Sequence, residues 1–366
     1  MIKNFKNLLN FLILDKHHKK FVFYSEGKNY YCYFEDLINE IIKRRQHIYY
    51  ITSDKKELHF KNLNITSIYI GSGILRRIFF AVLSCENFIM TLTDLNNHEL
   101  KKSKLCERYI YIFHAPQSTH KIYTESAFDN YDVIFCNGKY QVDEIRLREK
   151  KNFLKKKILV KTGYLYFDYL KKNLSSLKKI KKKTILFAPT WTKKNILLKD
   201  YAKNIISDLL RNNFKVIFRP HPEHIIREKE FIKEIKFNFN YNENFKFDEN
   251  SENLNSIEDS EAMITDYSGI FSEFLFSTYK TIFFTSCEKK INNKNFNKIS
   301  LQSFEEAAIS KFSIKFHPNN IKYIINNYET LIKNFRNKRK MIKKFKKENF
   351  YNLGKVSKEM IKFFKI

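Results

Sequence analysis

Short apolar runs alternate with segments of helical period along the first half of the chain. Residues 33–45 have the spacing of a helix with one apolar face. Six other runs have the length and composition of strands, at residues 21–24, 48–51, 67–70, 88–92, 109–113 and 133–136. Near-continuous apolar strands separated by helices are typical of a parallel sheet that is covered on both faces.

The same alternation of apolar runs and helical segments begins again after a charged stretch at residues 171–183. Strands are expected at residues 184–188, 215–219, 262–265 and 281–285, and a helix at 201–211. The pattern therefore predicts an α/β protein with two doubly wound parallel-sheet domains, whose ligands bind outside the carboxyl ends of the strands. The expected division is residues 1–170, a linker at 171–183, a second domain at 184–335, and basic C-terminal helices at 336–366.

Both ends of the chain have amphipathic character. The lysine-rich segment 321–366 repeats apolar residues at helical spacing, namely Ile332, Phe335, Met341, Ile342 and Phe345. Residues 1–14 do the same with Phe5, Leu8, Leu9, Phe11 and Leu12. A basic amphipathic helix is typical either of contact with an anionic membrane surface or of packing on a domain with its lysines in solvent. Both interpretations stay open for both ends.

The charge of the chain limits the class of partner. With 68 lysines and arginines against 39 acids, the formal net charge is +29, which favours polyanions or an anionic membrane surface. The five scattered cysteines include no Cys-x-x-Cys pair, which indicates reduced thiols in the cytosol. Residues 78–92 are too short and too interrupted to span a bilayer comfortably. No P-loop, G-x-G-x-x-G motif or complete set of metal ligands is present.

Residues 265–269 (Thr-Asp-Tyr-Ser-Gly) join a predicted strand to a predicted helix. The first turn of a helix offers free backbone N–H groups and the positive end of the dipole, which together favour a phosphate. The alternative is an ordinary helix cap, made by Asp266 or Ser268.

Three segments place proline beside polar residues directly after predicted strands, at residues 112–116, 187–191 and 218–222. In the last segment His221 lies between two prolines and close to Arg219, an arrangement suited to holding a phosphate. His114 follows a strand of the first domain, where an imidazole can act as a general base on a hydroxyl or serve only as a structural residue.

At these residues the sequence resembles the CDP-glycerol glycerophosphotransferase family, which builds teichoic-acid and related capsular polymers. The resemblance rests on residues 188–191 (Ala-Pro-Thr-Trp), 219–222 (Arg-Pro-His-Pro) and 265–269 with Glu273. Weaker similarity extends over residues 23–27, 113–114, 131–135 and 163–168. The family implies a GT-B fold, in which two Rossmann-like domains face a cleft and the C-terminal domain binds the CDP-linked donor.

The resemblance also implies site roles. His114 matches a histidine that activates the acceptor hydroxyl, while His221 and Arg219 match residues at the donor diphosphate. Further donor or phosphate ligands are expected from Thr190, Thr265, Asp266, Ser268, Gly269 and Glu273. Three positions depart from the family pattern: Gly269 replaces a serine, Glu273 an aspartate, and Ala115 a glycine.

The expected function is transfer of glycerol phosphate from CDP-glycerol, or a related CDP-polyol, to a hydroxyl of an anionic cell-surface polymer or its lipid-linked precursor, with release of CMP. Neither a metal nor a cofactor is expected. One alternative is a GT-B glycosyltransferase that uses a nucleotide sugar in capsule or lipooligosaccharide synthesis. Another is a polyanion- or nucleic-acid-binding protein without catalysis, although no motif for specific nucleic acid is present. The expected location is the cytoplasm, with the inner face of the membrane as an open alternative.

Overall fold

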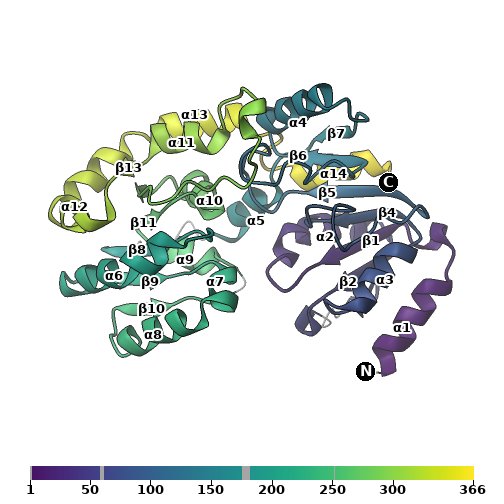
Figure 1. Cartoon of the computed structure of the whole chain (residues 1–366), viewed down its shortest axis with the longest axis horizontal. Helices are drawn as coiled ribbons and strands as arrows, with labels where there is room; N and C mark the ends of the chain where they lie inside the picture. Colours follow the sequence, from purple (N-terminus) through teal and green to yellow (C-terminus); the bar gives the residue numbers. More distant parts are fainter. Residues whose placement is uncertain (1, 58–61, 175–181, 251) are drawn as a thin grey trace.

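The computed structural model describes residues 2–57, 62–174, 182–250 and 252–366 and contains two parallel sheets (Figure 1). The first sheet has seven strands in the order β3-β2-β1-β4-β5-β6-β7. Its strands are β1 (Phe21–Ser25), β2 (Ile48–Thr52), β3 (Ile65–Tyr69), β4 (Cys85–Met90), β5 (Cys106–Ile112), β6 (Val133–Cys136) and β7 (Ile158–Lys161). All of its registers are parallel.

The second sheet has six parallel strands in the order β10-β9-β8-β11-β12-β13. Its strands are β8 (Thr184–Ala188), β9 (Lys215–Phe218), β10 (Phe245–Phe247), β11 (Ala262–Thr265), β12 (Thr281–Phe284) and β13 (Ile314–Lys315). The predicted fold class of two doubly wound parallel sheets is confirmed. Every predicted strand is present with small shifts at its ends, whereas β7, β10 and β13 were not predicted.

Helices cover both faces of each sheet (Figure 1). Before the second sheet the chain forms α1 (Ile2–Ile13), α2 (Glu35–Lys43), α3 (Ile74–Val82), α4 (Lys139–Lys151) and α5 (Leu165–Asn173). It then forms α6 (Ala202–Arg211), α7 (Pro222–Arg227), α8 (Lys229–Phe239), α9 (Leu254–Asp259), α10 (Gly269–Thr278), α11 (Phe304–Phe312), α12 (Ile321–Arg336), α13 (Arg339–Asn349) and α14 (Val356–Phe364). None of the described helices is long and apolar enough to cross a membrane.

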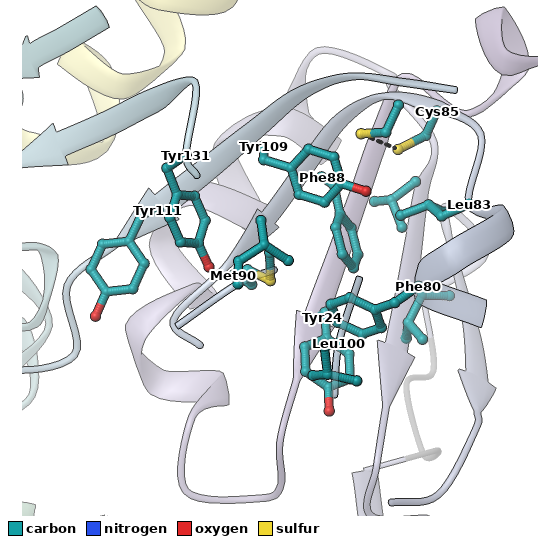
Figure 2. Close-up of a cluster of buried hydrophobic side chains, with 14 of the residues drawn as sticks. Tyr24, Phe80, Leu83, Cys85, Phe88, Met90, Leu100, Tyr109, Tyr111 and Tyr131 are labelled. Carbon is teal, nitrogen blue, oxygen red and sulfur yellow. Dashed lines mark hydrogen bonds between the residues drawn. The ribbon is translucent and has the colours of Figure 1, made fainter. Parts of the chain in front are cut away.

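The core of the first domain is rich in aromatic rings (Figure 2). Tyr24 meets Phe80 edge to face at 5.0 Å between ring centroids, and Phe80 meets Phe88 in the same way at 5.2 Å. The thiols of Cys85 and Cys106 lie 3.5 Å apart on neighbouring strands. All five cysteines are free thiols, as the sequence predicted.

The C-terminal helices return across the molecule. Helix α14 packs on the first sheet beside α2, and the ring of Phe364 meets that of Phe21 at 5.1 Å. On α12 and α13 the side chains of Ile332, Phe335, Ile342 and Phe345 are buried, whereas Met341 is exposed. The apolar stripe of these two helices therefore faces the protein interior.

The expected domain boundaries stay a prediction. Helix α5 ends at Asn173, inside the expected linker 171–183, and residues 175–181 of that linker lie outside the described part of the chain. The buried face of α5 belongs to the same hydrophobic core as α10.

Candidate active site

One cavity of about 280 Å³ lies between the carboxyl ends of the two sheets. The segments after β5, β8 and β9, the N-terminus of α10, and the loop after β12 all contribute to its lining. Seven of the nine predicted site residues line it, namely His114, Thr190, Arg219, His221, Ser268, Gly269 and Glu273. The fold thus brings together residues that are separated by up to about 160 positions in the sequence.

Helix α10 begins in this cavity without a side-chain cap. Ser268 has the extended backbone of an N-cap residue, with φ −100° and ψ 150°, yet its side chain makes no capping hydrogen bond. Asp266, the other predicted cap, accepts a hydrogen bond from the backbone of Thr190 instead, at 2.8 Å. In the first turn the N–H of Phe271 donates to the carbonyl of Ser268 at 3.2 Å, which leaves the N–H groups of Gly269 and Ile270 able to bind an anion.

Thr265 and Asp266 lie one layer behind the cavity and are not among its lining residues. The hydroxyl of Thr265 donates to the carbonyl of Ala188 at 2.6 Å, which joins the ends of β11 and β8. The carboxyl group of Asp266 is buried, and burial raises its pKa to about 7. Asp266 therefore orients the backbone of Thr190 and Thr265 that of Ala188, and neither side chain lines the cavity.

Arg219 extends from the end of β9 and is held by an ion pair with Asp248, at 2.7 Å between nitrogen and oxygen. Asp248 also accepts a hydrogen bond from the hydroxyl of Ser256. Because its partner is itself fixed and buried, the guanidinium group is oriented before any ligand arrives.

His221 serves as the N-cap of the short helix α7. Its Nδ1 accepts a hydrogen bond from the backbone N–H of Glu223 at 3.2 Å, so the proton of the neutral ring is on Nε2. Burial lowers the pKa of His221 well below 6.5, and the charge of Lys290 lowers it further. At neutral pH this histidine is therefore a neutral ring whose Nε2–H can donate a hydrogen bond to a ligand.

His114 lies on the opposite side, after β5, within a group of tyrosines. Its ring meets Tyr30 at 5.6 Å, Tyr33 at 6.2 Å and Tyr123 at 6.4 Å, each roughly edge to face. Burial lowers the pKa of His114 to about 4, and the charge of Lys290 lowers it further. A neutral imidazole that can accept a proton is the form present at neutral pH.

Glu273 lines the cavity, but both of its oxygens are occupied by protein groups. One accepts from the hydroxyl of Tyr164 at 2.7 Å, and the other from the side-chain amide of Asn253 at 2.6 Å. The same hydroxyl of Tyr164 lies 3.2 Å from the carbonyl oxygen of His114. Glu273 thereby links α10 to the segment that carries His114.

Sequence reasoning missed several lining residues, above all Lys290, Tyr30 and Tyr33. Lys290 carries no signal of its own, since it is one of 68 lysines and arginines. Tyr30 and Tyr33 follow the 23–27 segment and resemble ordinary apolar positions of a helix start. Within the described residues, no group of three or more histidines, cysteines and acids is arranged to hold a metal ion.

Comparisons with known proteins bear on the family and the fold of the chain. Residues 7–289, more than half of the chain, match the sequence model of the family described as CDP-Glycerol:Poly(glycerophosphate) glycerophosphotransferase. No curated protein sequence matches the chain.

Among solved structures, the wall teichoic acid polymerase TagF soaked with CDPG is similar, with a TM-score of 0.66 and 14% identity over 99% of this chain and 92% of that one. The UDP-GlcNAc 2-epimerase of Methanocaldococcus jannaschii, in complex with UDP-GlcNAc and UDP, has a TM-score of 0.55 and 13% identity over 94% and 99% of the two chains. At such identities the structures establish only the fold, which is of the GT-B type. Since the family match covers most of the chain, this protein belongs to the CDP-glycerol:poly(glycerophosphate) glycerophosphotransferase family and is a transferase of that type.

Proposed function

We propose that the described cavity is the active site, and that it moves glycerol phosphate from CDP-glycerol to a hydroxyl of an anionic polymer or its lipid-linked precursor. The observation that carries this proposal is the uncapped N-terminus of α10, which opens into the same cavity as His221, Arg219 and His114. Free N–H groups, an oriented guanidinium group and an imidazole N–H donor form a suitable environment for a diphosphate.

The reaction assigns a role to each side of the cavity. The acceptor oxygen forms a bond to the β-phosphorus, the bond between that phosphorus and the bridging oxygen breaks, and CMP leaves with the bonding electrons. His114 takes the proton of the acceptor hydroxyl, while Arg219, His221 and the start of α10 stabilise the charge spread over the phosphate oxygens. Thr190, positioned by Asp266, adds a hydroxyl at the same place.

The test is release of CMP from CDP-glycerol in the presence of a glycerol-phosphate polymer or a lipid-linked primer. CDP-ribitol and common nucleotide sugars serve as competing donors. CMP release from CDP-glycerol supports the proposal, and sugar transfer from a nucleotide sugar without CMP release would replace it with a glycosyltransferase. Polyanion binding without turnover of any donor would indicate a non-catalytic protein.

We also propose that the first domain contacts an anionic membrane surface through α1 and α3. Helix α1 packs on β3 and meets α3 where the rings of Phe11 and Phe79 stack at 5.6 Å. Their outward apolar side chains are exposed, namely Phe5, Leu9, Leu12, Ile13, Ile74, Leu75, Ile78 and Val82. Lys6 is exposed among them, and Arg77 is exposed in an ion pair with Glu99 at 2.7 Å, so basic groups border the apolar side chains as at the interface of an anionic bilayer.

Replacing Leu9 and Ile78 together by aspartate tests this surface. The double variant is expected to lose most of its binding to vesicles that contain anionic phospholipid, measured by co-sedimentation, because two charges enter the apolar face. The matched control is Phe237→Asp on α8, whose side chain is 84% exposed outside the α1–α3 surface and whose change should leave binding intact. Equal binding by the double variant and the parent would contradict the assignment.

A further inference from the structure

Lys290 is a lining residue of the cavity that no family motif covers. It lies in the loop after β12, one residue beyond the end of the family match at 289. Its neighbours in the lining include Arg219, His221 and His114 from both sides of the site. The lysine thus brings a cation from a third segment to the place where the diphosphate is expected.

The ammonium group of Lys290 and the guanidinium group of Arg219 differ in their hydrogen-bond and ion-pair partners. Its Nζ donates a hydrogen bond to the hydroxyl of Thr190 at 3.3 Å. Among the described residues no carboxylate lies within ion-pair distance of it, whereas Arg219 has Asp248 at 2.7 Å. A partly buried ammonium group with a single neutral partner has hydrogen-bonding capacity left for an anion.

The electrostatics of the site agree with a central position. The charge of Lys290 contributes to lowering the pKa of both His114 and His221, so it lies within electrostatic reach of both. Burial lowers the pKa of Lys290 itself, and the nearest acid that opposes this shift is Asp266, behind Thr190. Among the described residues Asp266 acts on the ammonium ion only from behind Thr190, so an incoming anion would be its direct counterion.

We propose that Lys290 is a catalytic residue of the transfer reaction, which binds the diphosphate of the donor together with Thr190 and neutralises the charge that develops on the departing CMP. This inference rests on the proposed function, since it names a further ligand of the same donor. A compact ammonium group fits a bridging or terminal phosphate oxygen, while the planar fork of Arg219 orients the group from the other side.

The alternative is that Lys290 only supports the turn at Thr190. The two roles differ in what the protein can bind. Loss of a structural support changes stability and affinity for every ligand, whereas loss of a phosphate ligand weakens the binding of diphosphates and leaves cytidine unaffected.

The experiment compares the parent protein with Lys290→Gln, Lys290→Arg and the control Lys289→Gln, which removes the same charge from the exposed neighbour. Calorimetric titration uses cytidine, CMP, CDP-glycerol and inorganic pyrophosphate, with thermal unfolding to check folding. Lys290→Gln is expected to weaken CDP-glycerol and pyrophosphate by roughly 10–100-fold, the range of one charge-assisted hydrogen bond. Lys290→Arg should recover most of that loss, the cytidine affinity should not change, and kcat for CMP release should fall in Lys290→Gln.

Two outcomes would overturn the inference. Binding of CDP-glycerol by Lys290→Gln within twofold of the parent would remove the lysine from the donor site while leaving the proposed function intact. Equal weakening of cytidine and diphosphates would assign Lys290 to the support of Thr190. If the parent binds pyrophosphate through Lys290 but no cytidine compound, the donor assignment fails and the role of the lysine as a diphosphate ligand stands.

Discussion

The two walls of the cavity differ in charge. The N-terminal wall has no lysine, arginine or acid among its described lining residues, which are Asn29, Tyr30, Cys32, Tyr33, His114, Ala115, Gln117 and Tyr166. The C-terminal wall carries Arg219, Lys290, Glu223 and Glu273 together with His221 and the start of α10. A wall without formal charge suits a neutral hydroxyl and an uncharged base, whereas a wall with oriented cations suits a diphosphate. In the proposed mechanism this division separates activation of the acceptor from binding of the donor.

The largest expected effect comes from the N-terminal wall. His114→Asn should lower kcat for CMP release by roughly 10²–10⁴-fold, because the general base is lost. Affinity for CDP-glycerol should change little, since the donor ligands lie on the other wall. Stopped assays of CMP release and calorimetric titration measure the two quantities. His98→Asn, at an exposed histidine, is the control, and a large loss of donor affinity in His114→Asn would break the division between the walls.

A smaller effect is expected on the pH dependence of stability. Because the folded-state pKa of His114 is about 4, below its ordinary value of 6.5, the unfolded chain binds a proton that the folded protein excludes. This contribution is present above about pH 6.5 and is lost as the pH falls toward about 4; linkage gives at most about 2 kcal/mol at about pH 5. His114→Asn should therefore lose less free energy of unfolding than the parent between about pH 7.5 and about pH 5. Identical losses, measured by denaturant titration, would mean that the histidine titrates normally.

The smallest effect concerns the point where the two walls touch. A Cβ atom added at Gly269 would lie 3.3 Å from the Cβ atom of Ala115, closer than an ordinary contact. Gly269→Ser should destabilise the protein slightly, and Ala115→Gly should relieve it, with a coupling of roughly 0.5–1 kcal/mol in a double-mutant cycle. Gly73→Ser is the control, since an added Cβ there meets nothing within 4 Å. Strict additivity would show that the walls do not press on each other at this point.

This contact also relates two of the departures from the family pattern, Ala115 and Gly269, to each other. The family usually has glycine at the position of Ala115 and serine at that of Gly269, whereas this chain has the larger side chain on the N-terminal wall. The closeness of the two positions lets only one of them carry a full side chain without adjustment.

The central strands could be predicted because burial on both faces makes them continuously apolar, as in β1 and β8. Three of the four edge strands were missed. The strands β7, β10 and β13 are short, and each contains an exposed lysine that interrupts its apolar pattern. Proline after a strand identified the segments of His114, Thr190 and His221, because it marks the carboxyl end where ligands bind. The role of Lys290 in lining the cavity could not be predicted, since nothing in its local sequence distinguishes it from the many lysines in solvent. The distinction between Asp266 behind the cavity and Ser268 at its surface depends on how the loop after β8 packs, which the local sequence does not encode.

The return of α14 to the first sheet has a consequence for how the protein is made. During synthesis the strands of the first domain leave the ribosome early, but Phe21, Phe135 and Val133 remain without their covering residues Val356, Met360 and Phe364 until the second domain has been translated. This face of the first sheet can therefore reach its final packing only after residues 356–364 have been translated, behind the whole of the second sheet.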